Sequence, residues 1–215
     1  MIIHNQPVQH AGNPLSVARK VLIMVHGRGD SAKSFIGLSS ELNASVDEFA
    51  FLAIQAIQNT WYPYSFLAPV NQNEPNLSLS LSAVSELLDD LMGLRFSTSQ
   101  IYFLAFSQGA CLTLEFCARH AKRYGGVIAF TGGLIGESLT RTNYKGNFEG
   151  TPIFIGSSEH DPHVPESRIE ESQVILESMG ANVIKKIYPG LGHTINHDEL
   201  MMASLILNNQ LGPKT

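Results

Sequence analysis

The chain has 215 residues, a formal net charge of −5 with neutral histidines, and a hydrophobic content of 44%. This length fits one domain spanning residues 1–215, and so high a hydrophobic content excludes intrinsic disorder. The acidic balance and the lack of a Lys/Arg cluster exclude a general nucleic-acid binder, because such a protein needs a basic patch.

The cysteine content and the N-terminal sequence bear on the cellular compartment. Cys111 and Cys117 do not make a disulfide framework, and their spacing in a predicted helix turns the two side chains apart. The N-terminus lacks the basic and apolar regions of a signal peptide. No apolar run approaches the ~20 residues that a membrane span requires. We therefore expect a cytoplasmic protein without a membrane span.

Segments typical of buried strands alternate with segments of helical periodicity. Apolar and β-branched runs predict strands at Lys20–His26, Phe49–Ile54, Gln100–Ala105, Gly126–Phe130, Thr151–Ile155 and Asn182–Tyr188. Apolar residues at helical spacing predict helices over about Phe35–Leu42, Leu81–Leu91, Gln108–Ala121 and Ile169–Met179. A last helix is predicted to open after Asn196, where an Asn cap with Glu199 three residues on resembles a capping box. This alternation predicts an α/β fold with a mostly parallel sheet and helices on both faces. Sites in such sheets lie at the carboxyl ends of the strands.

A nucleophile motif follows the third predicted strand. Ala105-Phe106-Ser107-Gln108-Gly109 leads directly from a buried strand into a helix. This is the context of the nucleophile elbow, Gly-x-Ser-x-Gly, in which a strained turn between small residues exposes the serine. Ala105 replaces the first glycine, and its methyl group is small enough to fit. Ser107 is therefore the candidate nucleophile, and an ordinary helix N-cap serine is the alternative interpretation.

A serine hydroxyl needs a base, and the base needs an orienting acid. His193 follows the sixth predicted strand in a glycine-rich segment, while Asp161 follows the fifth, with Glu159 as a competing acid. Taken singly, each could be a loop residue without a chemical role. Together, Ser107, Asp161 and His193 follow the chain order of the α/β-hydrolase fold, and they predict a catalytic triad.

The segment His26-Gly27-Arg28-Gly29 ends the first predicted strand. Acyl transfer creates an oxyanion that backbone N–H groups stabilise, one from the residue after the nucleophile and one from a strand-end loop. Gln108 and Arg28 are the candidates for these donors. Two alternatives stay open: the Arg28 side chain binds an anionic substrate, or the segment is a turn without chemistry. The glycine spacing is too short for a dinucleotide fingerprint.

Four aromatic residues lie between Trp61 and Phe66, within a predicted loop from Gln55 to Pro75. Long loops inside compact domains are usually functional, and substrate pockets are mostly apolar. We expect Trp61 and Phe66 to bind substrate, with Trp61 as a wall of the pocket. The alternative, that the aromatics hold the loop to the core, is equally compatible with the sequence.

Two histidine pairs raise the question of a metal site, namely His160 with His163 and His193 with His197. No accompanying Glu or Cys pattern fits zinc, and His193 is better explained as the base. We therefore predict neither a metal nor an organic cofactor.

These motifs resemble the phospholipase/carboxylesterase family, which includes acyl-protein thioesterases and bacterial carboxylesterases. The resemblance rests on His26–Gly29, Ala105–Ala110, Asp161–Pro165 and Tyr188–His193, and Asn59–Phe66 looks like a bacterial carboxylesterase branch. It covers nearly the whole chain. It implies a compact serine hydrolase with a minimal lid or none, no cofactor, frequent homodimers, and the catalytic and oxyanion residues already named.

The predicted function is hydrolysis of a small carboxylic ester or thioester through an acyl-enzyme on Ser107. Lysophospholipase, acyl-protein thioesterase and peptidase activities are alternatives on the same scaffold. A non-catalytic binder is disfavoured because nucleophile and base are both kept. A cysteine nucleophile at Cys111 is disfavoured because this residue lies one helical turn after Ser107 and is expected to pack. The acyl length, the leaving group and the oligomeric state stay open.

Overall fold

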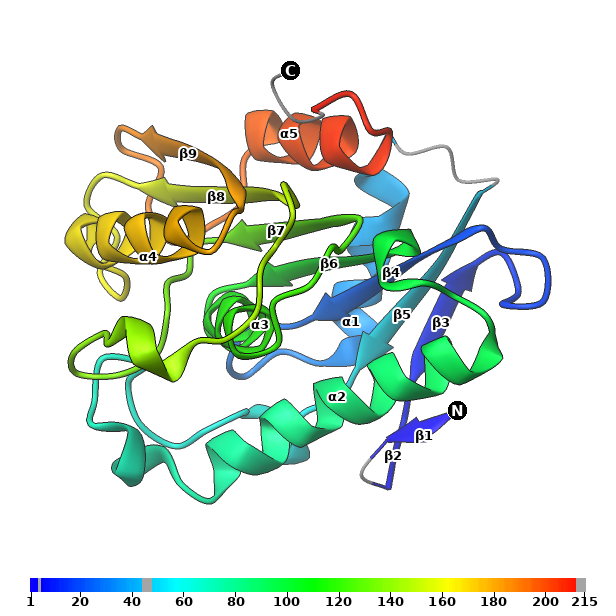
Figure 1. Cartoon of the computed structure of the whole chain (residues 1–215), viewed down its shortest axis with the longest axis horizontal. Helices are drawn as coiled ribbons and strands as arrows, with labels where there is room; N and C mark the ends of the chain where they lie inside the picture. Colours follow the sequence, from blue (N-terminus) through cyan, green and yellow to red (C-terminus); the bar gives the residue numbers. More distant parts are fainter. Residues whose placement is uncertain (4, 44–47, 212–215) are drawn as a thin grey trace.

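The computed structural model describes residues 1–3, 5–43 and 48–211. Its centre is a seven-stranded sheet of order β3-β5-β4-β6-β7-β8-β9 (Figure 1). β3 pairs antiparallel with β5, and the other neighbours are parallel. The strands are β3 (Gln9–Gly12), β4 (Lys20–Val25), β5 (Phe49–Ile54), β6 (Ile101–Phe106), β7 (Gly126–Phe130), β8 (Pro152–Ser158) and β9 (Asn182–Tyr188). A separate two-stranded ribbon joins β1 (Ile2–Ile3) and β2 (Gln6–Pro7).

The predicted mostly parallel α/β sheet is confirmed, and the six predicted strands correspond to β4 to β9. The antiparallel edge strand β3 was not predicted. Its sequence, Gln-His-Ala-Gly, has no apolar run, and its residues alternate between half-buried and exposed. Pairing with β5, rather than a local pattern, makes these four residues a strand.

Helices cover both faces of the sheet (Figure 1). They are α1 (Ala32–Phe35), α2 (Asn76–Leu94), α3 (Gln108–Arg119), α4 (Glu166–Ser178) and α5 (His197–Leu207). Short 3₁₀ turns occupy Ile36–Glu41, Ile57–Asn59, Val70–Asn73, Thr98–Gln100 and Arg141–Asn143. α1 and the turn after it replace the single longer helix predicted there. The predicted capping box of α5 is confirmed, because the Asn196 and Glu199 side chains each accept the other's backbone N–H at 2.9 Å.

Buried hydrophobic residues form two clusters, one on each face of the sheet, because successive side chains of a strand point to opposite faces. In β4, Val21, Ile23 and Val25 face the cluster that includes residues of α2, α3 and α4, while Leu22 and Met24 face residues of α1 and α5. All five side chains are fully buried. A sheet covered on both faces requires strands that are apolar throughout, which agrees with the low charged fraction of 15%.

The parallel strands bring distant segments of the chain to one edge of the sheet. Because β4 to β9 are parallel, the segments that follow β4, β6, β8 and β9 all begin at the same edge, where the carboxyl ends lie. The long connection from β5 to α2 begins at this edge too. Both cysteines are buried free thiols in α3. Among the described residues, no helix combines the length and apolar character needed to cross a membrane.

Candidate active site

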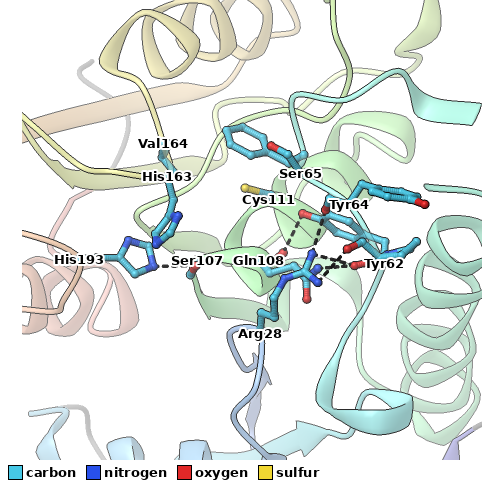
Figure 2. Close-up of a pocket in the computed structure, with 12 residues that line it drawn as sticks. Arg28, Tyr62, Tyr64, Ser65, Ser107, Gln108, Cys111, His163, Val164 and His193 are labelled. Carbon is cyan, nitrogen blue, oxygen red and sulfur yellow. Dashed lines mark hydrogen bonds between the residues drawn. The ribbon is translucent and has the colours of Figure 1, made fainter. Parts of the chain in front are cut away.

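Ser107, His193 and Asp161 form a continuous hydrogen-bonded chain. His193 Nδ1 lies 2.7 Å from Asp161 Oδ2, and His193 Nε2 lies 2.8 Å from Ser107 Oγ. Since a carboxylate only accepts, Nδ1 carries the proton and Nε2 accepts from the Ser107 hydroxyl. Figure 2 shows the imidazole directed at the serine. The tertiary fold thus brings together three residues that lie up to 86 positions apart.

Asp161 is held by its own loop as well as by the histidine. Its Oδ1 accepts the backbone N–H groups of His163 at 2.8 Å and Val164 at 2.9 Å. The carboxylate side chain is fully buried, and these bonds offset the cost of burying its charge. The competing acid, Glu159, is exposed.

Two aromatic rings enclose the imidazole of His193. The Phe106 ring centroid lies 5.0 Å from it, and the His163 ring meets it edge-on at 4.8 Å. The sequence pattern suggested His163 only as a metal ligand, and this contact was not predicted. Its position two residues after Asp161 was the available signal, because the turn that binds the carboxylate also carries the His163 ring to the site.

Ser107 has the strained backbone expected of a nucleophile elbow. Its φ of 53° and ψ of −119° are unfavourable for a residue with a Cβ. Gly109, two residues after Ser107, must lack a side chain, because a Cβ there would lie 2.3 Å from Val25 O and 2.4 Å from His26 O. The turn therefore packs directly against the end of β4.

Two backbone N–H groups are available beside Ser107. Gln108 is the first residue of α3, so its N–H has no acceptor within the helix. Within the described part of the chain, the backbone N–H of Arg28 has no acceptor. Both residues line the same cavity as Ser107 and His193. These are the two positions predicted from the sequence as oxyanion donors.

The cavity beside Ser107 has a volume of about 450 Å³. Its apolar side is formed by Tyr62, Pro63, Tyr64 and Phe66, and Val164 adds an apolar group beside His163. Ser107 and His193 lie across the cavity from Tyr62 and Tyr64 (Figure 2). Phe66 lines the cavity as predicted.

The prediction that Trp61 forms a wall of the cavity is wrong. Trp61 is not among the residues that line the cavity, and Tyr62 and Tyr64 take the predicted place. The indole N–H donates to His26 O at 2.8 Å, which ties the loop to the end of β4. A buried indole needs a partner for its N–H, and the strand end supplies one.

His26 is a fully buried structural histidine. Its Nδ1 donates to Gly27 O at 2.7 Å, and its Nε2 accepts the Ala56 N–H at 3.2 Å. Burial lowers the pKa of His26, so the ring stays neutral and joins the ends of β4 and β5. Among the described residues, no three His, Cys, Asp or Glu side chains gather in an arrangement able to hold a metal ion.

Comparison with known proteins identifies the family of this chain. A family model described as Phospholipase/Carboxylesterase matches residues 8–211. The chain belongs to the phospholipase/carboxylesterase family. A crystal structure of a phospholipase/carboxylesterase from Dyadobacter fermentans shares 48% sequence identity with this member, with a TM-score of 0.91, over 96% of this chain and 98% of that one.

Curated relatives of this family member are more distant. An acyl-protein thioesterase 1 from Debaryomyces hansenii is 26% identical over 90% of this chain and 92% of its own length. A probable carboxylesterase SOBER1-like protein from Arabidopsis thaliana is 24% identical over 86% of this chain and 76% of its own. The protein is thus an ester-cleaving hydrolase of the α/β-hydrolase fold.

Proposed function

We propose that this family member hydrolyses small carboxylic esters or thioesters through an acyl-enzyme on Ser107. The observation that carries this proposal is the chain from Asp161 through His193 to Ser107 at the edge of an apolar cavity. No cofactor takes part in it.

In the first half-reaction, Ser107 Oγ attacks the carbonyl carbon while His193 Nε2 takes the hydroxyl proton. The carbonyl oxygen becomes an oxyanion, which the N–H groups of Arg28 and Gln108 stabilise. Collapse of the tetrahedral intermediate breaks the bond to the leaving alcohol or thiol, and His193 returns the proton to it. In the second half-reaction, His193 Nε2 takes a proton from water as the water oxygen attacks the acyl carbon. The bond from this carbon to Ser107 Oγ then breaks, His193 returns the proton to Ser107, and the acid leaves.

The cavity supports a small substrate. Its volume of about 450 Å³ lies within the usual range for small-molecule sites, and its apolar side suits a hydrocarbon acyl group. Ester and thioester carbonyls react by the same steps, so the leaving group is to be determined by assay. Acyl-protein thioesterase and lysophospholipase activities are the alternative outcomes. Cytoplasmic location and homodimer formation stay predictions, and the free thiols are compatible with the former.

Labelling with a fluorophosphonate probe tests the proposal, because the probe reacts with an activated serine. We expect stoichiometric labelling of the wild-type protein and none of Ser107→Ala. Ser65 lines the same cavity, but its Oγ accepts the Leu67 N–H at 3.2 Å, so Ser65→Ala is the matched control and should be labelled normally. Labelling that persists in Ser107→Ala would contradict the assignment of the nucleophile.

A further inference from the structure

Residues 61–66 form neither a helix nor a strand, and residues 62–66 of this segment line the cavity. Each of their six carbonyl groups nevertheless accepts a hydrogen bond from a group outside the segment. The donors, in chain order of the acceptors, are Ser80 Oγ to Trp61, Arg28 and Gln108 to Tyr62, Arg28 to Pro63, Arg28 to Tyr64, Asn73 Nδ2 to Ser65, and Gly136 N to Phe66. Hydrogen bonds from other parts of the chain therefore satisfy the backbone carbonyls of this segment, as neighbouring strands do in a sheet.

Two side chains donate the hydrogen bonds that the carbonyl groups of residues 62–64 accept. The Tyr64 N–H donates to a third side chain, Asn73 Oδ1, at 2.9 Å. The Arg28 guanidinium donates from Nη1 to Pro63 O at 3.0 Å, and from Nη2 to Tyr62 O at 2.9 Å and Tyr64 O at 2.8 Å. The Gln108 amide accepts the Trp61 N–H at 3.0 Å and donates to Tyr62 O at 2.7 Å. Figure 2 shows the guanidinium pointing into the curve of this segment.

These are the same two residues to which the proposed function assigns the oxyanion N–H groups. We propose that the side chains of Arg28 and Gln108 are positioning residues that fix the cavity wall at residues 62–64 and thereby set the acyl selectivity. This inference rests on the proposed function, because ester hydrolysis is the reaction in which the selectivity is measured. Each of the two residues thus acts twice, through its backbone N–H on the reacting carbonyl and through its side chain on the wall.

The planar fork of an arginine is required for this role. Three carbonyl oxygens are bound by one rigid group, whereas a lysine ammonium is a point charge on a flexible stem. A role in binding an anionic substrate would need only the charge. Arg28→Lys keeps the positive charge but loses the planar fork, so it separates positioning of the wall from binding of an anionic substrate. Arg28→Met removes both the charge and the fork, while it keeps most of the aliphatic stem and the backbone N–H.

The test measures kcat and KM for nitrophenyl acetate and nitrophenyl hexanoate. A small acyl group makes few contacts with the wall, whereas a long one depends on it. We expect Arg28→Met and Arg28→Lys to lower the hexanoate-to-acetate ratio of kcat/KM roughly tenfold or more, the scale on which a hydrophobic pocket discriminates between chain lengths. Gln108→Met should lower the same ratio, and it serves as the test if Arg28→Met does not fold.

Arg95 provides a matched control. Its guanidinium also holds loop carbonyls, with Nη2 lying 2.8 Å from Ser16 O, but it does so at the opposite edge of the sheet. Arg95→Met should leave the selectivity ratio unchanged. The proposal is overturned if the folded Arg28 or Gln108 variants lower kcat/KM for both esters by one common factor, which leaves the hexanoate-to-acetate ratio unchanged. It is also overturned if Arg28→Lys keeps the wild-type ratio. Failure of the proposed function is distinguishable, because it would appear as a wild-type protein that the fluorophosphonate does not label at Ser107.

Discussion

Asp161 binds His193 with one carboxylate oxygen and its own loop with the other, so the two oxygens have distinct roles. Asn can replace the oxygen that binds the loop but not the one that binds histidine. The loop N–H groups would take the amide oxygen, which leaves the amide NH₂ facing His193 Nδ1. The imidazole would then carry its proton on Nε2, toward Ser107, where it cannot act as a base.

We therefore expect Asp161→Asn to lower kcat for a nitrophenyl ester roughly 10,000-fold with little loss of stability. Glu159→Gln, which changes the exposed competing acid, is the control and should retain the wild-type rate. A steady-state assay of both variants decides between the two acids. A larger loss in Glu159→Gln than in Asp161→Asn would contradict the assignment.

Replacement of Ser107 should separate catalysis from backbone strain. Ser107→Ala and Ser107→Gly both remove the proposed nucleophile, and kcat should fall around a million-fold in each. Only glycine tolerates a φ of 53° with a ψ of −119° without cost. Ser107→Gly should therefore be more stable than Ser107→Ala by roughly 1 kcal/mol in denaturant unfolding. Equal stabilities would show that the turn is not strained.

Gly109 should not tolerate a side chain. A Cβ at this position would meet the carbonyl oxygens of Val25 and His26 at 2.3 and 2.4 Å, and backbone cannot yield easily. We expect Gly109→Ala to lower the free energy of unfolding by roughly 3 kcal/mol. A Cβ on Gly93 in α2 would meet nothing within 4 Å beyond its own helix, so Gly93→Ala should stabilise the protein by roughly 0.5–1 kcal/mol. Opposite signs for two glycine-to-alanine changes in helices make the pair informative.

Glu199 should make stability depend on pH. Burial, with a smaller contribution from the charge of Asp198, raises the pKa of Glu199 to about 7, and its Oε1 has no hydrogen-bond partner among the described residues. Because the folded protein binds the proton more tightly than the unfolded chain, stability is highest below the unfolded pKa near 4.5 and falls as pH rises toward 7.

Glu199→Gln keeps the acceptor for the Asn196 N–H and cannot ionise. Wild type should therefore lose roughly 3 kcal/mol relative to Glu199→Gln between pH 4.5 and pH 8. Denaturant unfolding of both proteins across this range measures the difference. A constant difference would mean that Glu199 does not titrate there.

Cys111 should be unreactive although it lines the cavity. Burial raises the pKa of its thiol to about 12, and its side chain is 1% exposed. Since the thiolate is the reactive form, iodoacetamide should leave the native protein active and unmodified at this position. The unfolded protein should be alkylated at both cysteines, which is the control. Loss of activity in step with alkylation of Cys111 would contradict this expectation.

Local patterns were sufficient to predict the core strands, the capping box of α5 and the residues of the triad. A buried parallel strand must be apolar throughout, and a nucleophile elbow needs small residues at set positions around Ser107, so both leave a signature in consecutive residues. The order of Ser107, Asp161 and His193 along the chain then identified them as a group. Their assignment as the catalytic residues stays a proposal until the variants are measured.

Only the tertiary structure decided which aromatic residues face the cavity and what holds them there. Trp61 and Tyr62 are neighbours of similar character, and nothing in their spacing shows that the indole binds His26 O while the phenol lines the cavity. The bonds from Arg28 and Gln108 to residues 61–64 likewise join segments more than thirty positions apart. Such contacts depend on where the sheet brings the loops together, and a one-dimensional pattern does not record them.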